Sequence, residues 1–228
     1  MMRSIKITPN YLKFGDGSCL IEMGETKIIC ASTIEEGRIP PHCEAKNTGW
    51  VTAEYSMLPR SAKQRTPRAR NLASGRTHEI QRLIGRALRS VVNLDIVGKR
   101  TIIVDCDAVQ ADGGTRTASV NGAFIAMCLA FQKLQKEKKI IGKPVLDYLG
   151  AISAGIVRGK KILDLSAEED NIADVDMNVV MTGDGHFVEV QSTAEGSGFT
   201  LTDMEEMLAL ARKGIKQIIE LEKRIIKI

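Results

Sequence analysis

The most constraining feature of this 228-residue sequence is a strand-like segment joined to a helix-like segment by two glycines. Residues 101–109 read Thr-Ile-Ile-Val-Asp-Cys-Asp-Ala-Val, and an apolar run extends over residues 120–134. Between them, residues 111–118 read Ala-Asp-Gly-Gly-Thr-Arg-Thr-Ala. Because glycine adopts positive φ angles without steric cost, the pair predicts a tight turn between a strand and a central buried helix.

The same turn has the chemistry of an anion-binding site. The first turn of a helix carries backbone N–H groups with no internal partner, and its dipole favours negative charge. Gly114 leaves these groups uncovered, Thr115 adds a hydroxyl, and Arg116 adds a planar fork of donors suited to phosphate. The pattern is not a Walker A loop, because no Gly-Lys-Ser/Thr follows at the required spacing. Phosphate is therefore a candidate ligand, and the simpler alternative is an ordinary turn.

Composition and cysteine usage indicate the setting of the protein. The sequence is 43% hydrophobic, which is enough to bury a sizeable core, and it contains no apolar run of about 18 residues that would span a membrane. Its five cysteines have no Cys-x-x-Cys spacing, which is typical of free thiols in a reducing compartment. The first residues lack the apolar block of a secretory signal. We therefore expect a cytoplasmic protein that does not associate with membranes.

Positive charge is concentrated in one window of the chain. Residues 60–92 contain nine basic residues and a single acidic one, so this window carries +8 in a chain of net charge +4, and the remainder carries −4. Eight of the nine are arginines, whose planar donors match phosphate better than lysine does. This distribution is expected of a surface that binds a polyanion, and the plainer alternative is a solvated loop and helix face.

Hydrophobic periodicity predicts a helix over residues 80–91 of that window. Arg82, Arg86 and Arg89 fall on the side opposite its apolar residues, where a solvated face is the simplest interpretation. The other expected elements are a hairpin over 18–34 that turns at Gly24-Glu25, strands over 50–57, 148–157 and 161–165, a hairpin over 174–191, and a final helix that begins with a capping box at residues 202–205 and ends near residue 224.

The sequence predicts one domain made of two similar halves. No linker rich in Gly, Ser or Pro divides it, and each half has strands followed by a helix. Lys143-Pro144 begins the second series of elements. We therefore expect a single domain of the α/β (α+β) class over residues 1–228, with halves of approximately 1–142 and 143–228.

An acidic segment leads into one strand of the second half. Residues 168–176 read Glu-Glu-Asp-Asn-Ile-Ala-Asp-Val-Asp, with five carboxylates in nine positions. Alternation along the strand places Asp176 on the face opposite the apolar Val175 and Met177, and Asp170 is expected to fold back beside it. Two carboxylates near a phosphate site suit Mg²⁺, whose other ligands are water and substrate oxygens. The alternative is an exposed acidic loop.

At these residues the sequence resembles the RNase PH family of phosphate-dependent exoribonucleases, which trim tRNA 3′ ends. One matching segment reads Gly-Trp-Val-Thr-Ala-Glu-Tyr-Ser-Met-Leu-Pro-Arg, from residue 49 to residue 60. The others are residues 74–77, 79–86, 110–118, 175–178, 188–191 and 193–196. They occur in the expected order over nearly the whole chain, and their joint occurrence is specific to this family.

The resemblance implies a fold, an assembly and a reaction. The fold has two βαβ-type halves, each with a mixed sheet backed by helices, and six copies form a hexameric ring as a trimer of dimers. In the reaction, inorganic phosphate attacks the terminal 3′ phosphodiester of a tRNA precursor or another RNA and releases a nucleoside diphosphate. The reaction is reversible, so the same enzyme is a nucleotidyltransferase.

The resemblance also implies roles for individual residues. Gly114, Thr115 and Arg116 bind the attacking phosphate together with Arg76, and Arg116 is also catalytic. Asp170 and Asp176 correspond to the family's metal-binding and acid/base carboxylates, which makes Mg²⁺ the expected cofactor. The RNA-binding residues expected from the basic loop are Arg60, Arg65, Arg68 and Arg70.

Members of the family usually begin with an arm that contains Arg-x-Asp-Gly-Arg, whereas this sequence starts near its first predicted strand. Contacts of that arm are therefore not part of the expectation. Two other functions remain as alternatives. One is a catalytically inactive, RNA-binding ring subunit of an exosome-like assembly, which would lack the anion site or the acidic pair. The other is a hydrolytic nuclease, which would release monophosphates and would not need phosphate.

Overall fold

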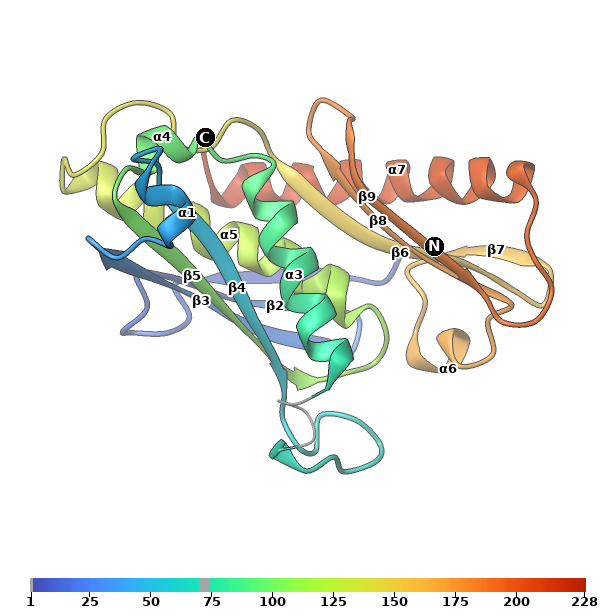
Figure 1. Cartoon of the computed structure of the whole chain (residues 1–228). Coiled ribbons are helices and arrows are strands. Elements are labelled where there is room, and N and C mark those ends of the chain that lie inside the picture. Colours follow the sequence, from blue (N-terminus) through green and yellow to red (C-terminus); the bar gives the residue numbers. More distant parts are fainter. Residues whose placement is uncertain (1, 70–73) are drawn as a thin grey trace.

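The computed structural model describes residues 2–69 and 74–228 and contains two β-sheets backed by helices (Figure 1). The first sheet has the strand order β1-β2-β3-β5-β4, and the second has the order β7-β6-β8-β9. The strands of the first sheet are β1 (Ile5–Pro9), β2 (Gly17–Met23), β3 (Thr26–Glu36), β4 (Trp50–Met57) and β5 (Arg100–Gln110). Those of the second are β6 (Leu149–Val157), β7 (Lys160–Leu163), β8 (Val175–Thr182) and β9 (Phe187–Ala194). The expected α/β class with two mixed α/β halves is confirmed.

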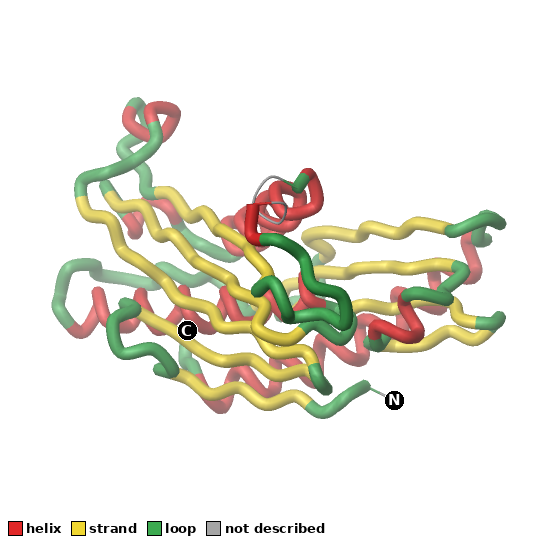
Figure 2. Tube along the Cα trace, turned by 90° about the horizontal axis from the view of Figure 1, so that it is seen from below, coloured by secondary structure: helices red, strands yellow, loops and turns green. Residues whose placement is uncertain are grey.

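Seen from below, the two sheets lie side by side, with helices along both (Figure 2). The longer helices are α3 (Gly75–Arg89), α5 (Thr115–Lys136) and α7 (Leu201–Ile225), and the short ones are α1 (Pro41–Glu44), α4 (Leu94–Val97) and α6 (Ala167–Asp170). One hydrophobic cluster contains buried residues from both sheets and from the three long helices. A single continuous core therefore holds the two halves together.

The predicted β2–β3 hairpin is confirmed, and the strands are longer than their apolar alternation suggested. β3 continues to Glu36 because it pairs with β5 along its whole length. β4 and β5 are parallel, so the chain needs a crossover between them, and α3 provides it. The apolar face of α3 is buried as the periodicity predicted, with Ile80, Leu83 and Ile84 in the core.

Helix α5 is the central helix of the molecule, as its apolar sequence predicted. It packs against β2 and β3 of the first sheet and against β6 of the second. Most of its residues are buried, including Phe124 and Phe131. The side chain of the buried Asn121 donates to the carbonyl of Ala151 at 2.9 Å and accepts from the amide of Ala151 at 2.7 Å. These bonds join α5 to the backbone of β6, so they fix the start of α5 relative to the second half.

Helix α7 covers one face of the second sheet, and its start differs from the prediction. The capping box is formed by Thr200 and Asp203, whereas the sequence favoured a box that begins at Thr202. Two threonines with a carboxylate nearby satisfy the same pattern in two registers, and packing of the helix chooses between them. Among the described residues no helix is long and apolar enough to cross a membrane.

Candidate active site

A cavity of about 320 Å³ lies where elements of both halves meet. The first half contributes the start of α3 and the turn between β5 and α5. The second half contributes β6, α6, β8 and β9. Its polar lining consists of Arg76, Gly114, Thr115, Arg116, Ser153, Asp170, Asp176, Asn178, Gln191, Thr193 and Glu195. The cavity therefore contains the predicted phosphate-binding residues and both predicted metal ligands.

The glycine turn takes the conformation that its sequence predicted. Gly113 and Gly114 have φ angles of +80° and +64°, which side chains with a Cβ rarely adopt. A Cβ on Gly113 would lie 2.3 Å from the carbonyl oxygen of Leu165, so the turn packs directly against backbone of the second half. Only a residue without a side chain fits there, and this contact places the start of α5 beside α6.

A partly buried ion pair lies next to the turn, close to Gly114. The Nη2 atom of Arg3 lies 2.6 Å from Oδ1 of Asp164, whose side chain is fully buried. The backbone N–H of Arg3 donates to the other carboxylate oxygen at 3.0 Å. Thr26 donates to the carbonyl oxygen of Gly113 at 2.6 Å. The turn is thus fixed by residues from three distant parts of the chain.

The backbone N–H groups in the first turn of α5 have no side-chain cap and are available to a ligand. Its N-cap residue, Gly114, has no side chain to cap the helix, and the turn contains no acidic residue. Tyr55 is buried in β4, and its hydroxyl donates to Oγ1 of Thr115 at 3.1 Å. Because Thr115 accepts this bond, its own hydroxyl hydrogen can be directed toward the cavity. Burial raises the pKa of Tyr55, which keeps the phenol protonated as a donor.

Arg116 is held by one residue from α3 and one from β9. Its Nη1 atom lies 3.0 Å from Oε1 of Glu79 and 2.7 Å from Oε1 of Gln191. The Nε2 atom of Gln191 also donates to Oε1 of Glu79, at 3.1 Å. The Arg116 side chain is only 16% exposed, so its position is determined mainly by these neighbours.

The two carboxylates line the same cavity. Asp176, on β8, is half-buried, whereas Asp170, at the end of α6, is exposed. Burial raises the pKa of Asp176, the nearby Asp170 raises it further, and Arg116 opposes both effects. Both carboxylates line one cavity, so Asp170 folds back toward Asp176, as the sequence predicted. Among the described residues no group of three or more His, Cys, Asp or Glu side chains could hold a metal ion, so these two would need other oxygen ligands.

The remaining predicted site residues are one arginine of α3 and those of the loop that follows β4. Arg76, in the first turn of α3, is exposed and lines the cavity. The loop that follows β4 extends away from the sheets at the bottom of Figure 1. It carries the exposed Arg60, Arg65 and Arg68, none of which lines the cavity. The fourth predicted RNA-binding residue, Arg70, lies outside the described residues.

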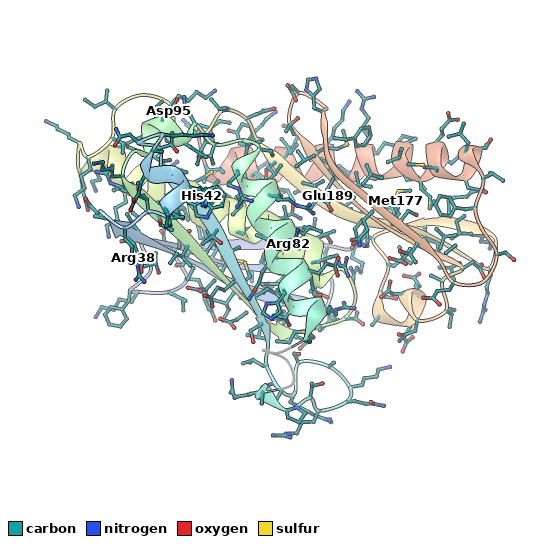
Figure 3. All side chains as sticks on the ribbon, viewed as in Figure 1. Arg38, His42, Arg82, Asp95, Met177 and Glu189 are labelled. Atoms are coloured by element: carbon teal, nitrogen blue, oxygen red, sulfur yellow. The ribbon has the colours of Figure 1, made fainter. Side chains whose placement is uncertain are left out.

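The arginines of α3 form a solvated face, as periodicity favoured, except at Arg89. Arg82 is exposed, and Figure 3 labels it on α3. Arg86 donates from Nη2 to both carboxylate oxygens of Glu189, at 3.0 Å each, so it joins α3 to β9. Arg89 donates to the carbonyl of Val51 at 2.7 Å and stacks on Trp50. Arg82 and Arg86 are thus both exposed as predicted, although Arg86 is also paired with β9, and Arg89 is partly buried against β4.

Sequence reasoning gave no role to three residues that contact the predicted anion site. Glu79, Gln191 and Tyr55 all lie within the segments that resemble the family, but no local pattern indicates what they touch. The one available signal was Glu79, the single acidic residue among nine basic ones in residues 60–92.

Two family models match the sequence of this chain. The model of the 3′ exoribonuclease family, domain 1, matches residues 1–131, and the model of domain 2 of the same family matches residues 147–214. The chain belongs to the 3′ exoribonuclease family. The prediction made from the motifs is confirmed, and the two family models correspond to the parts of the chain that carry the two sheets.

Individual members of the 3′ exoribonuclease family are similar over nearly the full length. Ribonuclease PH of Bacillus cytotoxicus is 54% identical over 97% of this chain and 91% of its own length. Ribonuclease PH of Solibacter usitatus is 54% identical over 99% of this chain and 95% of its own. The chain is accordingly a phosphate-dependent 3′ exoribonuclease with nucleotidyltransferase activity, and an inactive ring subunit is not favoured.

Solved structures with lower identity agree on the fold. A chain of the Archaeoglobus fulgidus exosome, solved with RNA bound to the active site, has a TM-score of 0.80 at 21% identity, over 97% of this chain and 89% of that one. Rrp46 from rice has a TM-score of 0.78 at 17% identity, over 98% of this chain and 94% of that one. Both similarities concern the arrangement of helices and strands.

Proposed function

We propose that this cavity removes nucleotides from the 3′ ends of tRNA precursors and other RNAs by phosphorolysis. Inorganic phosphate binds at Gly114, Thr115, Arg116 and Arg76. One of its oxygens attacks the phosphorus of the last phosphodiester, and the bond from that phosphorus to the preceding 3′ oxygen breaks. The products are a nucleoside diphosphate and an RNA shorter by one nucleotide. The observation that carries this proposal is that anion donors and two carboxylates line one cavity.

The difficulty of this reaction is electrostatic, because phosphate and the RNA diester are both anions. Phosphoryl transfer requires positioning and charge neutralisation more than covalent help from the protein. Arg76 and Arg116 bring positive charge to the nucleophile, and the first amides of α5 add donors that need no rearrangement. Asp170 or Asp176 delivers a proton to the departing 3′ oxygen.

The pair of Asp170 and Asp176 fits Mg²⁺, which we propose as the cofactor. Carboxylate oxygens are hard ligands, and Mg²⁺ typically binds one or two of them together with water and substrate oxygens. Asp170 and Asp176 would hold the ion, which is consistent with two close carboxylates and a raised pKa of Asp176. When bound, Mg²⁺ neutralises charge on the reacting phosphoryl group.

The exposed arginines of the loop after β4 are assigned to RNA binding. Arg60, Arg65 and Arg68 attract the RNA backbone and guide its 3′ end toward the cavity, and Arg70 is assigned the same role from sequence alone.

Six copies form a ring as a trimer of dimers, for which light scattering should give a mass near six protomers. We place the enzyme in the cytoplasm, in accord with its five free, buried cysteines.

Product analysis tests the reaction. A tRNA with a 3′ extension is incubated with the enzyme and Mg²⁺, with and without inorganic phosphate, and the released nucleotides are separated. We expect nucleoside diphosphates only when phosphate is present. Monophosphates released without phosphate would indicate a hydrolase, and release of no nucleotide would indicate a ring subunit without activity.

A further inference from the structure

Within the described part of the chain, all side-chain hydrogen bonds of Arg116 are donated by a single nitrogen atom, Nη1. The Nη1 atom donates to Glu79 at 3.0 Å and to Gln191 at 2.7 Å. Gln191 in turn donates to the same oxygen of Glu79, at 3.1 Å. The three side chains thus form a closed triangle that joins α5, α3 and β9.

This triangle determines which edge of the guanidinium remains for a ligand. An Nη atom of arginine carries two hydrogens, and here one acceptor is available for each. The edge formed by Nη2 and Nε is left over, and it has the spacing that matches two oxygens of a phosphate. Since Arg116 lines the cavity and its side chain is only 16% exposed, this edge is the one available to an anion.

We propose that Glu79 and Gln191 are positioning residues, which orient Arg116 so that its Nη2–Nε edge holds the attacking phosphate in line with the RNA diester. The inference rests on the proposed function, because it requires phosphate to bind at Arg116. This role requires no contact of either residue with phosphate. Their effect is to remove the rotational freedom of a long side chain before the substrate arrives, so that less order has to be imposed during the reaction.

Glu79 has two properties, an acceptor oxygen and a negative charge, and two substitutions separate them. Glu79→Gln keeps an acceptor in the same place and removes the charge, whereas Glu79→Ala removes both. If orientation is the role, the single-turnover rate at saturating phosphate should fall on the order of tenfold in Glu79→Ala and stay within about twofold in Glu79→Gln. The KM for phosphate should fall in Glu79→Gln, because a negative charge no longer competes for Arg116.

The chain offers a matched control for a purely structural role. Glu189 also joins α3 to β9, through Arg86, but it does not contact Arg116. Figure 3 labels Glu189 on β9, on the side of the second sheet that lies toward α3. Glu189→Ala breaks this second link and should leave the single-turnover rate within about twofold of the unmodified enzyme, since such exposed pairs contribute little. Thermal unfolding of all variants shows whether each is folded.

A double mutant decides whether Glu79 acts through Arg116. In an Arg116→Ala background, adding Glu79→Ala should cause no further loss, because the group to be oriented is already absent. Additive losses would overturn the inference, as would equal single-turnover rates in Glu79→Ala and Glu79→Gln. If Arg116→Ala itself retains normal phosphate dependence, the phosphate site is wrong and the proposed function fails with it. If Arg116→Ala loses that dependence while Glu79→Ala is normal, only the positioning role fails.

Discussion

The hydroxyl of Thr115 and the guanidinium of Arg116 are each hydrogen-bonded to a neighbour that leaves the rest of the group available to a ligand. Tyr55 donates to Thr115, and Glu79 and Gln191 accept from Arg116. Side chains fixed in this way lose less freedom when they bind an anion than flexible surface residues do. Preorganised donors are also the usual source of electrostatic stabilisation in phosphoryl transfer.

At the scale of single residues, we expect Tyr55→Phe to weaken phosphate binding without loss of the fold. Phenylalanine fills the same space, but Thr115 then loses a donor and its hydroxyl is no longer oriented. The KM for phosphate should rise by about threefold to tenfold, which corresponds to one hydrogen bond of about 0.5–1.5 kcal/mol. The KM for RNA should be unchanged. Equal KM values for phosphate in the two proteins would contradict the orientation of Thr115.

Asp176→Asn is expected to stop turnover and spare RNA binding. The substitution keeps the shape of the side chain but removes one carboxylate of the proposed metal-binding and acid/base pair. Nucleotide release should fall at least about 100-fold, the usual scale for an acid/base group. RNA affinity, measured by fluorescence anisotropy without phosphate, should change less than about twofold, because RNA binding rests mainly on contacts between basic residues and phosphates.

Asp174→Asn is the matched control, because Asp174 is an exposed carboxylate two residues away that does not line the cavity. It should retain full activity. Normal turnover in Asp176→Asn would remove Asp176 from the metal site, and a parallel loss in both variants would indicate a general effect of charge near β8.

At the scale of elements, the junction of β5 and α5 determines where the predicted phosphate-binding residues lie. The turn approaches the backbone of Leu165 on one side and accepts a hydrogen bond from Thr26 on the other. Helix α5 then continues between the sheets, so its first turn cannot move without the core. A phosphate site at this junction is held rigid by the packing of the two halves.

Gly113→Ala should therefore reduce both stability and activity. Its Cβ would lie 2.3 Å from the carbonyl oxygen of Leu165, and the φ angle of +80° is unfavourable for alanine. We expect a loss of about 2–4 kcal/mol in the free energy of unfolding, measured with urea. Gly159→Ala separates the two causes, because its φ angle is +73° and nothing lies within 4 Å of its Cβ. It should cost about 1 kcal/mol and leave activity intact. Equal losses in the two variants would contradict a steric role for the contact with Leu165.

At the scale of the whole molecule, the end of α7 belongs to the core that both halves share. Glu222 on this helix is completely buried, and neither of its carboxylate oxygens has a hydrogen-bond partner in the described structure. Burial raises its pKa well above the ordinary value near 4.5, and the nearby Cys19 of β2 adds to the effect. A buried carboxyl without a partner is stable only when protonated.

Stability should therefore decrease with increasing pH. Between the unfolded pKa, near 4.5, and the raised folded pKa, the folded state binds more protons than the unfolded state. The stabilising effect is thus complete below the unfolded value and is lost as pH rises through the folded value, with a slope of at most about 1.4 kcal/mol per pH unit.

Urea unfolding between pH 5 and pH 9, compared with Glu222→Gln, measures this decrease. The variant should have a flatter profile, because its side chain does not ionise. Glu220→Gln is the control, since Glu220 is exposed and paired with Lys223, and it should follow the unmodified protein. Parallel profiles for the protein and Glu222→Gln would show that Glu222 does not ionise in this range.

The sequence alone determined the parts of this protein that depend on near neighbours along the chain. Apolar periodicity predicted α3 and α5, and the glycine pair predicted the turn and its positive φ angles. Alternation put Asp176 on the face opposite Val175. The family motifs then identified the reaction. In each case the relevant interaction is with residues a few positions away, or with a core that any apolar face requires.

Only the tertiary structure decided which side chains meet around Arg116 and which arginines are engaged elsewhere. Glu79 is 37 positions from Arg116 and Gln191 is 75 positions away, and neither contact follows from a local pattern. Arg86 and Arg89 are likewise engaged by β9 and by β4. The physical reason is that a side chain's partners depend on how the two sheets dock across the shared core. That docking is a sum over many distant contacts, which no single segment of the chain encodes.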